Sequence, residues 1–247
     1  MKTMILAAAV MAAFAGSCAQ AEDKKPDHEV SFNASIVSDY RYRGISQTRL
    51  DPALQGGADY THNPSGFYAG TWLSTIKWIK DTPGAGSTPV EWDIYGGKKG
   101  EIAKDVSYDV GGLAYVYVNN KLKDAGAENA NTFELYGQIG YGPAYIKYSH
   151  SLTNLFGFVD SHGSGYLDAG ANVEMAEGLT LNLHAGHQRI KNNSAFSYTD
   201  WKVGLTKDFG IATGSIALIG TNSDAYRGPN GENLGKNGLV VSVGKTF

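Results

Sequence analysis

The sequence contains one cysteine, no long hydrophobic run beyond its N-terminus and no excess of basic residues. A single cysteine excludes a disulfide framework, which is how many small exported domains are stabilised. The 21 Lys and Arg residues are outnumbered by 24 Asp and Glu residues, which argues against a basic surface for nucleic acid. No later segment approaches the roughly 20 apolar residues of a membrane-spanning helix. The pattern of side chains must therefore indicate the fold.

The N-terminal residues Met1–Ala21 have the features of a secretory signal peptide. Lys2 precedes a short apolar segment, and Ala19-Gln20-Ala21 fits the small-x-small site of signal peptidase. Cys18 leaves open a lipoprotein signal, although the residue three positions before it is not the usual leucine. We expect cleavage after Ala21, which removes the only cysteine and leaves residues 22–247 as a single domain.

The rest of the chain is rich in glycine and tyrosine and has the periodicity of β-strands. Its 32 glycines are unfavourable in helices, where each costs about 1 kcal/mol relative to alanine. Apolar and polar residues alternate along most of the chain instead. In residues 133–141, for example, Phe133, Leu135 and Ile139 alternate with Glu134 and Gln138. Such segments are strands with one apolar and one polar face.

The lengths of the segments and of their connections point to a membrane barrel. Several segments reach about 10 residues, which is the span of a tilted strand across a bilayer. Long connections alternate with short ones, as in outer-membrane barrels, whereas a soluble sandwich gives no reason for this sorting. We therefore predict an all-β fold, a transmembrane antiparallel up-and-down β-barrel of about 12 strands in the outer membrane of a Gram-negative bacterium. The expected strands are residues 29–39, 53–62, 66–77, 90–100, 106–118, 131–142, 144–150, 164–175, 178–190, 198–208, 211–221 and 237–247.

The C-terminal segment has the features of a final barrel strand. Leu239, Val241, Val243 and the terminal Phe247 fall on one face of it. A terminal aromatic residue on such a strand resembles the signal recognised by the barrel-assembly machinery, so we expect that machinery and outer-membrane lipid as partners. Lys245 interrupts the apolar face, at low cost if its ammonium group snorkels to the interface.

Five segments resemble the TorF-type porin family: "SDYRYRGISQT", "GFYAGTWLS", "EWDIYGG", "YIKYSHSLTNLFG" and "YTDWKVGLTKDFG". Together they extend over nearly the whole chain after the signal peptide. The resemblance implies an outer-membrane barrel with a porin role. It implies no substrate.

The segment from Ser38 to Arg49 places two arginines between tyrosines. If the strand continues through it, Tyr40 and Tyr42 face the outer lipid interface while Arg41 and Arg43 point into the lumen near its mouth. The arginines then have two possible roles. They either pair with acidic residues on neighbouring strands and fix the register, or they form a charged ring that selects solutes.

Charged side chains on the expected inner face are the candidate pore-lining residues. They are Asp39, Arg41, Arg43, Glu91, Asp93, Asp109, Glu134, Lys147, Asp168, Glu174, Asp200 and Lys202. Eight of them are acidic and four basic, which favours cations modestly if the lumen is open. Twelve strands lie between eight-stranded barrels, which side chains fill, and porins of roughly 16 to 18 strands, so the strand count does not settle whether the lumen conducts.

We predict an outer-membrane, porin-like channel for passive diffusion of small polar solutes or ions. Two alternatives stay open: a non-transporting barrel that acts as a receptor or structural protein through its loops, and an enzyme with its site on the lipid face. Catalysis needs a nucleophile and a base within hydrogen-bond reach. His184 and His187 fall on opposite faces of a strand, and no other pair is evident, so we expect no catalytic, cofactor or metal site. The oligomeric state is not specified by the sequence.

We predict that tags inserted at residues 81–89 or 222–236 will bind antibody on intact cells, because the long loops should face outward. A tag at Asn63-Pro64 should bind antibody only after the outer membrane is permeabilised. Labelling of the short turn on intact cells would contradict the orientation.

Overall fold

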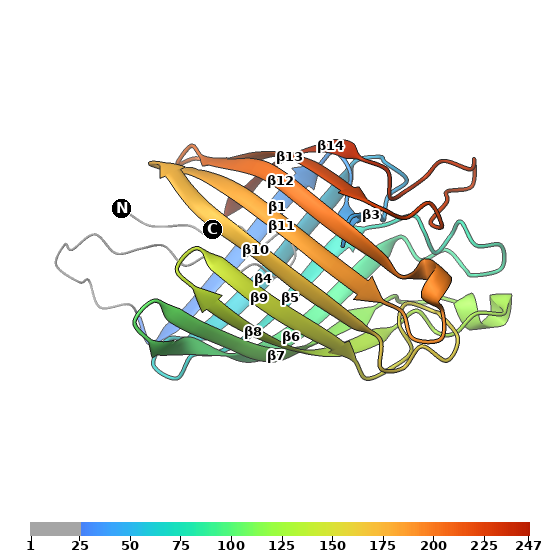
Figure 1. Cartoon of the computed structure of the whole chain (residues 1–247), viewed down its shortest axis with the longest axis horizontal. Helices are drawn as coiled ribbons and strands as arrows, with labels where there is room; N and C mark the ends of the chain where they lie inside the picture. The colour runs from blue at the N-terminus through green and yellow to red at the C-terminus, as the bar shows by residue number, and fades with distance from the viewer. Residues whose placement is uncertain (1–25) are drawn as a thin grey trace.

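The protein is a closed β-barrel with long loops at one end, described by a computed structural model over residues 26–247 (Figure 1). Twelve strands form the barrel, and each pairs antiparallel with its neighbour. The predicted fold and strand number are confirmed. The expected signal peptide, Met1–Ala21, lies outside the described residues.

All the predicted strands are present, with ends shifted by a few residues. They are β1 (His28–Val37), β4 (Ala53–His62), β5 (Phe67–Thr75), β6 (Val90–Ala103), β7 (Val106–Val116), β8 (Thr132–Tyr141), β9 (Ala144–Ser151), β10 (Gly165–Ala176), β11 (Leu179–Arg189), β12 (Tyr198–Asp208), β13 (Thr213–Thr221) and β14 (Gly238–Thr246). A separate hairpin is formed by β2 (Arg41–Tyr42) and β3 (Ile45–Ser46). Two short 3-10 helices, η1 (Leu122–Ala125) and η2 (Ser194–Phe196), lie in loops. Over residues 26–247, no helix has the length and apolarity to cross a membrane.

The sheet closes where the first strand meets the last. β1 pairs with β14 from Asn33 opposite Thr246 to Val37 opposite Ser242. The C-terminal residue extends this seam, because the Phe247 N–H donates to the Phe32 carbonyl at 2.7 Å and the Phe32 N–H donates to the Phe247 carbonyl at 3.2 Å. No strand of the barrel is therefore left with an unpaired edge.

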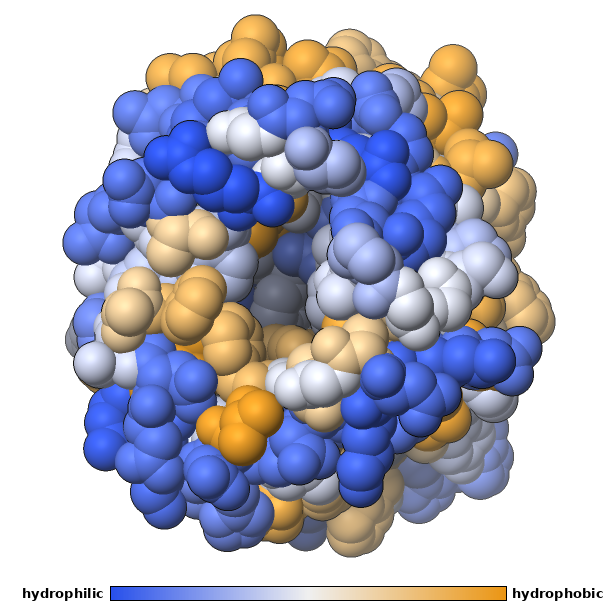
Figure 2. Space-filling model, turned by 90° about the vertical axis from the view of Figure 1, so that its right-hand side faces the viewer, coloured by the Kyte–Doolittle hydropathy of each residue, from blue (hydrophilic) through white to orange (hydrophobic). Residues whose placement is uncertain are grey.

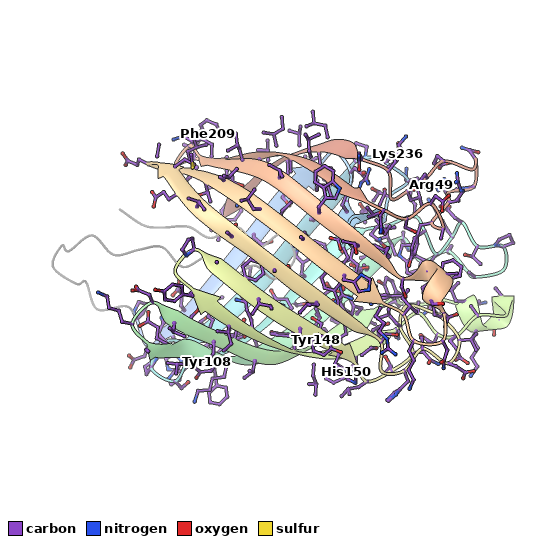
Figure 3. The ribbon with its side chains drawn as sticks, viewed as in Figure 1. Arg49, Tyr108, Tyr148, His150, Phe209 and Lys236 are labelled. Atoms are coloured by element: carbon purple, nitrogen blue, oxygen red, sulfur yellow. The ribbon has the colours of Figure 1, made fainter. Side chains whose placement is uncertain are left out.

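The outer face of the barrel is apolar, as the alternation predicted. On β14, Leu239, Val241 and Val243 are 58%, 44% and 57% exposed. Comparable side chains project from the other barrel strands. In water this belt would far exceed the apolar patches of soluble monomers, so it fits a hydrocarbon surrounding. Figure 3 shows Tyr108 and Phe209 near the short-turn end, where an aromatic girdle is expected.

The connections are sorted by length as predicted. Five short turns join β4 to β5, β6 to β7, β8 to β9, β10 to β11 and β12 to β13 at the end where the barrel begins and finishes. The six long loops lie at the other end (Figure 1). Three of these loops matter for the site: L1 (residues 38–52), L2 (residues 76–89) and L6 (residues 222–237).

We predict that Val241→Lys will lower the free energy of unfolding in lipid vesicles by about 2–4 kcal/mol, because it places a charge in the middle of the apolar belt. The adjacent Ser242→Lys is the matched control. Ser242 points inward, where its hydroxyl meets that of Ser215 at 2.7 Å, and a lysine there can reach water. Equal losses in urea titrations of the two variants would contradict the assignment of the faces.

Candidate functional site

Loop L1 turns into the barrel and fills much of its loop end. β1 ends at Val37, and the chain then bends inward rather than continuing along the wall. Tyr40 is only 5% exposed, and its hydroxyl donates to Glu91 Oε1 on β6 at 2.5 Å. Its ring packs edge-on against Trp72 of β5 at a centroid distance of 5.3 Å. L1 thus reaches strands that do not adjoin β1.

The prediction that Tyr40 and Tyr42 face the lipid interface is wrong. Both side chains turn inward, and the Tyr42 hydroxyl lies 2.5 Å from that of Tyr115 on β7. The Tyr42 ring packs edge-on against Tyr115 and against Phe156 of a neighbouring loop. The alternation persists in the sequence after Val37, but the chain has left the sheet, so it no longer sorts side chains between lipid and lumen.

Arg43 spans the lumen at the tip of the β2–β3 hairpin. Its guanidinium donates to both carboxylate oxygens of Glu134 on β8, at 2.7 and 3.1 Å, and to the Gln188 side chain on β11 at 2.6 Å. The rings of Tyr42 and Tyr166 lie 4.9 and 4.2 Å from its central carbon. Arg43 therefore pairs with an acid, as one interpretation expected, although the partner lies across the lumen rather than on a neighbouring strand. Bidentate, desolvated pairs of this kind fix geometry strongly.

The hairpin tip depends on a glycine. Gly44 has a φ of +80°, in the left-handed region that favours glycine. A Cβ at this position would lie 2.5 Å from Thr221 Cγ2 and 2.8 Å from Asp200 Cβ. The backbone of L1 therefore approaches the β12–β13 wall so closely that no side chain fits between them.

Arg41 anchors L1 to another loop instead of facing an open lumen. It forms an ion pair with Asp39 in its own loop. Its Nη1 also donates to the carbonyls of Leu234 at 3.2 Å and Lys236 at 2.8 Å in L6. Its side chain is 3% exposed. Arg41 thus holds L1 in place by satisfying backbone groups of L6.

Two ion pairs attach L1 to L2 on the outer side. Arg49 pairs with Asp81, and Lys77 pairs with Asp51. The hydrogen bond from Lys77, together with its charge, holds the pKa of the Asp51 carboxyl below its usual value. Figure 3 shows Arg49 among the loops at this end of the molecule. L1 is consequently attached to loops on both sides as well as to the inner wall.

A second charged cluster lies deeper in the lumen on β10 to β12. His184 Nδ1 lies 2.8 Å from Asp168 and Nε2 lies 2.7 Å from Asp200. Both ring nitrogens face carboxylates, and an imidazolium is the form that donates to both. The Tyr166 hydroxyl donates to Asp200 at 2.9 Å. Gly186 makes this contact possible, because a Cβ there would lie 2.0 Å from the Tyr166 hydroxyl.

The sequence analysis placed Asp168 and Asp200 on the inner face but missed their partner. His184 lies on the polar face of β11, and the strand register places it opposite Lys202 of β12. Aligning β11 with β10 and β12 would have placed His184 beside Asp168 and Asp200. Comparing His184 only with His187 on the same strand gives no information on neighbouring strands.

The remaining candidates lie on inward positions of the wall. Lys147 Nζ stacks 4.0 Å from the Tyr136 ring centroid, and Asp109 accepts from the Tyr68 hydroxyl at 2.6 Å. Asp93 is 8% exposed, and its Oδ1 has no hydrogen-bond partner among the described residues. Lys202 is half-buried on β12, Glu174 is exposed near the short-turn end, and Glu91 of β6 is buried beside L1. Asp39 is not on the wall, because it lies within L1 itself, where it is buried.

The two ends of the lumen differ in packing. At the loop end, inward residues such as Glu91, Tyr115, Glu134 and Gln188 are buried against L1. Towards the short turns, inward residues keep contact with solvent. On β13, β14, β1 and β4 most of these are small or neutral polar residues, and Asp59 of β4 and Glu29 of β1 are acidic exceptions. The small and neutral residues are Ser215, Ala217, Ser242, Thr246, Ser31, Asn33, Ser35, Gln55 and Gly57. Figure 2 shows a hollow at the centre of the loop end, with hydrophobic residues along part of its rim and mostly hydrophilic surface around them.

Comparisons with known proteins give a family and a fold. The chain belongs to a family described as bacterial protein of unknown function (Gcw_chp), whose sequence profile matches residues 20–247. Its structure is similar to the KdgM porin, with a TM-score of 0.55, 6% identity and coverage of 88% of this chain and 97% of that one. It is similar to the NanC porin with a TM-score of 0.55, 8% identity and coverage of 88% and 98%. A search of curated proteins found no match.

We predict that Arg43→Gln will lower the free energy of unfolding by about 3–5 kcal/mol, because it leaves the buried Glu134 carboxylate without its cation. Adding Glu134→Gln should recover part of the loss. Arg49→Gln is the control: that arginine also pairs with an aspartate, but its side chain is 30% exposed. Its loss should be at most about 1 kcal/mol. Urea titration in detergent gives all the values, and equal losses for Arg43→Gln and Arg49→Gln would contradict the role of the buried pair.

Proposed function

We propose that this protein is an outer-membrane channel for the passive diffusion of small polar solutes or ions. One observation carries the proposal: a closed barrel with an apolar exterior lines its interior with polar side chains on strand after strand. A barrel that served only as a membrane anchor would have no need of so many inward charges, which are costly to bury.

The similarity in fold to the KdgM and NanC porins supports this proposal. The five segments that resemble TorF-type porins support it as well, and we propose that the chain is of that type. In this view Met1–Ala21 directs export, and the terminal Phe247 serves recognition by the barrel-assembly machinery. The exposed Phe247 side chain at the β1–β14 seam is accessible for such recognition.

L1 makes the proposed channel narrow. The hairpin of β2 and β3 reaches strands on several sides of the lumen, so solutes must pass between it and the wall. The wall of β13, β14, β1 and β4 carries the smaller side chains and offers the wider path in the turn half. Such a constriction limits passage to small solutes, and its carboxylate surplus favours cations.

The packing of L1 also favours a second candidate function, a barrel that does not conduct and acts through its loops. Tyr40, Tyr42 and Arg43 all make side-chain contacts that hold L1 in the lumen. No comparable observation favours an enzyme. The one histidine that lies in a polar cluster, His184, has both ring nitrogens engaged by carboxylates and is not placed as a base beside a nucleophile.

We predict that the purified protein will give a small, steady conductance with weak cation preference in planar bilayers. Replacing residues 39–48 with a short Gly-Ser linker should raise the conductance, because it removes the constriction while leaving β1 and β4 intact. A matched replacement of residues 191–196 in another loop is the control and should leave conductance unchanged.

The outcomes distinguish the candidates. A silent wild type with a conducting linker variant would favour the non-conducting barrel closed by L1. Silence of both proteins, each shown to be folded by its mobility shift between boiled and unboiled samples, would overturn the channel.

A further inference from the structure

Two histidines meet on the outer surface at the short-turn end of the barrel. His28 on β1 lies directly opposite His62 on β4 in the strand register, and their ring centroids are 5.0 Å apart. Both histidines are on the outward face of the barrel, next to the outward pair formed by Val30 and Tyr60. His28 is exposed and His62 half-buried, so an ion in water can reach the pair.

One nitrogen of each ring is held by a hydroxyl group. His28 Nδ1 lies 2.8 Å from the Tyr60 hydroxyl, and His62 Nδ1 lies 2.6 Å from Ser65 Oγ in the following turn. Metal-binding histidines generally donate their second ring N–H to an oxygen, which fixes the tautomer and the ring orientation. The same arrangement here leaves both Nε2 atoms as the available ligands.

The separation of the rings suits one shared ion. With metal–nitrogen bonds of about 2.1 Å, an ion lies roughly 3.2 Å from each imidazole centroid, so two rings bound at about 100° have centroids roughly 5 Å apart. The observed 5.0 Å matches that value. The two imidazole rings alone give this spacing around the ion, without a carboxylate ligand. Lys98, two strands further along the same rim, is directed over the Phe67 ring.

We propose that His28 and His62 form a binding site for a late first-row divalent transition-metal ion such as Zn²⁺, with water completing the coordination. Imidazole is a preferred ligand of these ions. No group of three or more His, Cys, Asp or Glu side chains within residues 26–247 is arranged to hold a metal, so the site has two protein ligands and moderate affinity. It is independent of the proposed channel, because the histidines point away from the lumen. An ion there would link β1 to β4 at their outermost residues.

The test is isothermal titration of Zn²⁺ into detergent-solubilised protein purified without a histidine tag. We expect one equivalent to bind, and Mg²⁺ in the same range not to bind, because Mg²⁺ prefers oxygen ligands. His28→Asn and His62→Asn should each abolish the binding. His150→Asn is the matched control and should leave it unchanged, since His150 packs on Tyr148 and has no histidine opposite it.

Two further measurements separate this pair from general surface binding. Tyr60→Phe keeps both ligands but removes the hydroxyl that orients His28, and should weaken Zn²⁺ binding by up to about tenfold. Zn²⁺ should also raise the unfolding temperature of the wild type and of His150→Asn, but not of His28→Asn. Absence of binding to the folded wild type, or unchanged binding in both His28→Asn and His62→Asn, would overturn the site.

Discussion

Closure of the backbone hydrogen-bond ladder is the constraint on which the rest of this structure depends. A strand that faces hydrocarbon has no water to satisfy its N–H and C=O groups, so the sheet must end where it begins. The seam of β1 and β14 meets this requirement, and Phe247 extends it to the last residue of the chain. Once the ladder is closed, the two-residue period assigns the side chains of a regular strand to the lipid face or to the lumen.

The interior then has to satisfy its own polar groups. Carboxylates on the wall obtain donors from tyrosines, as Asp109 does from Tyr68, or from a cation, as Glu134 does from Arg43. L1 supplies several of these donors, including the hydroxyl of Tyr40 for Glu91. The loop and the wall are therefore one polar network. Without L1, Glu91 would keep the hydroxyl of Tyr117 as its donor, whereas Glu134 would lose its cation and keep the Tyr115 hydroxyl at 3.4 Å. Loss of a partner by a buried polar group costs about 1–3 kcal/mol, and more where the group is charged.

Strand positions and faces could be predicted from the sequence because both depend on local signals. Apolar residues repeat every second position along β8 and β14, and the short turns interrupt the pattern. The course of L1 could not be predicted this way. Tyr40 and Tyr42 continue the alternation beyond Val37, yet their direction depends on acceptors distant in the chain. Glu91 is 51 positions from Tyr40, and Glu134 is 91 positions from Arg43.

In the candidate site, too, some features could be predicted from the sequence and others could not. Inward placement of the charged residues on the strands followed from the two-residue period, but their partners did not. His184 joins Asp168 and Asp200 through cross-strand register, and His28 meets His62 in the same way on the opposite surface. Register was not available from the pattern of one strand, because it depends on how two strands and their turn are aligned.

Different contacts close the barrel and fill its lumen. The wall is held by backbone hydrogen bonds between neighbouring strands, whereas L1 contacts the inner face through the side chains of Tyr40, Tyr42 and Arg43. Its backbone hydrogen bonds lie mostly within the loop, as from Gln47 to Tyr40, and two join it to other loops, from Ser46 to Leu234 and from Lys77 to Gln47. One further bond, from Ser38 to Val241, goes to β14 at the start of the loop. Loss of the L1 contacts therefore removes no hydrogen bond between barrel strands. The strand ladder therefore keeps the barrel closed, whereas the side chains of L1 determine how much of the lumen is filled.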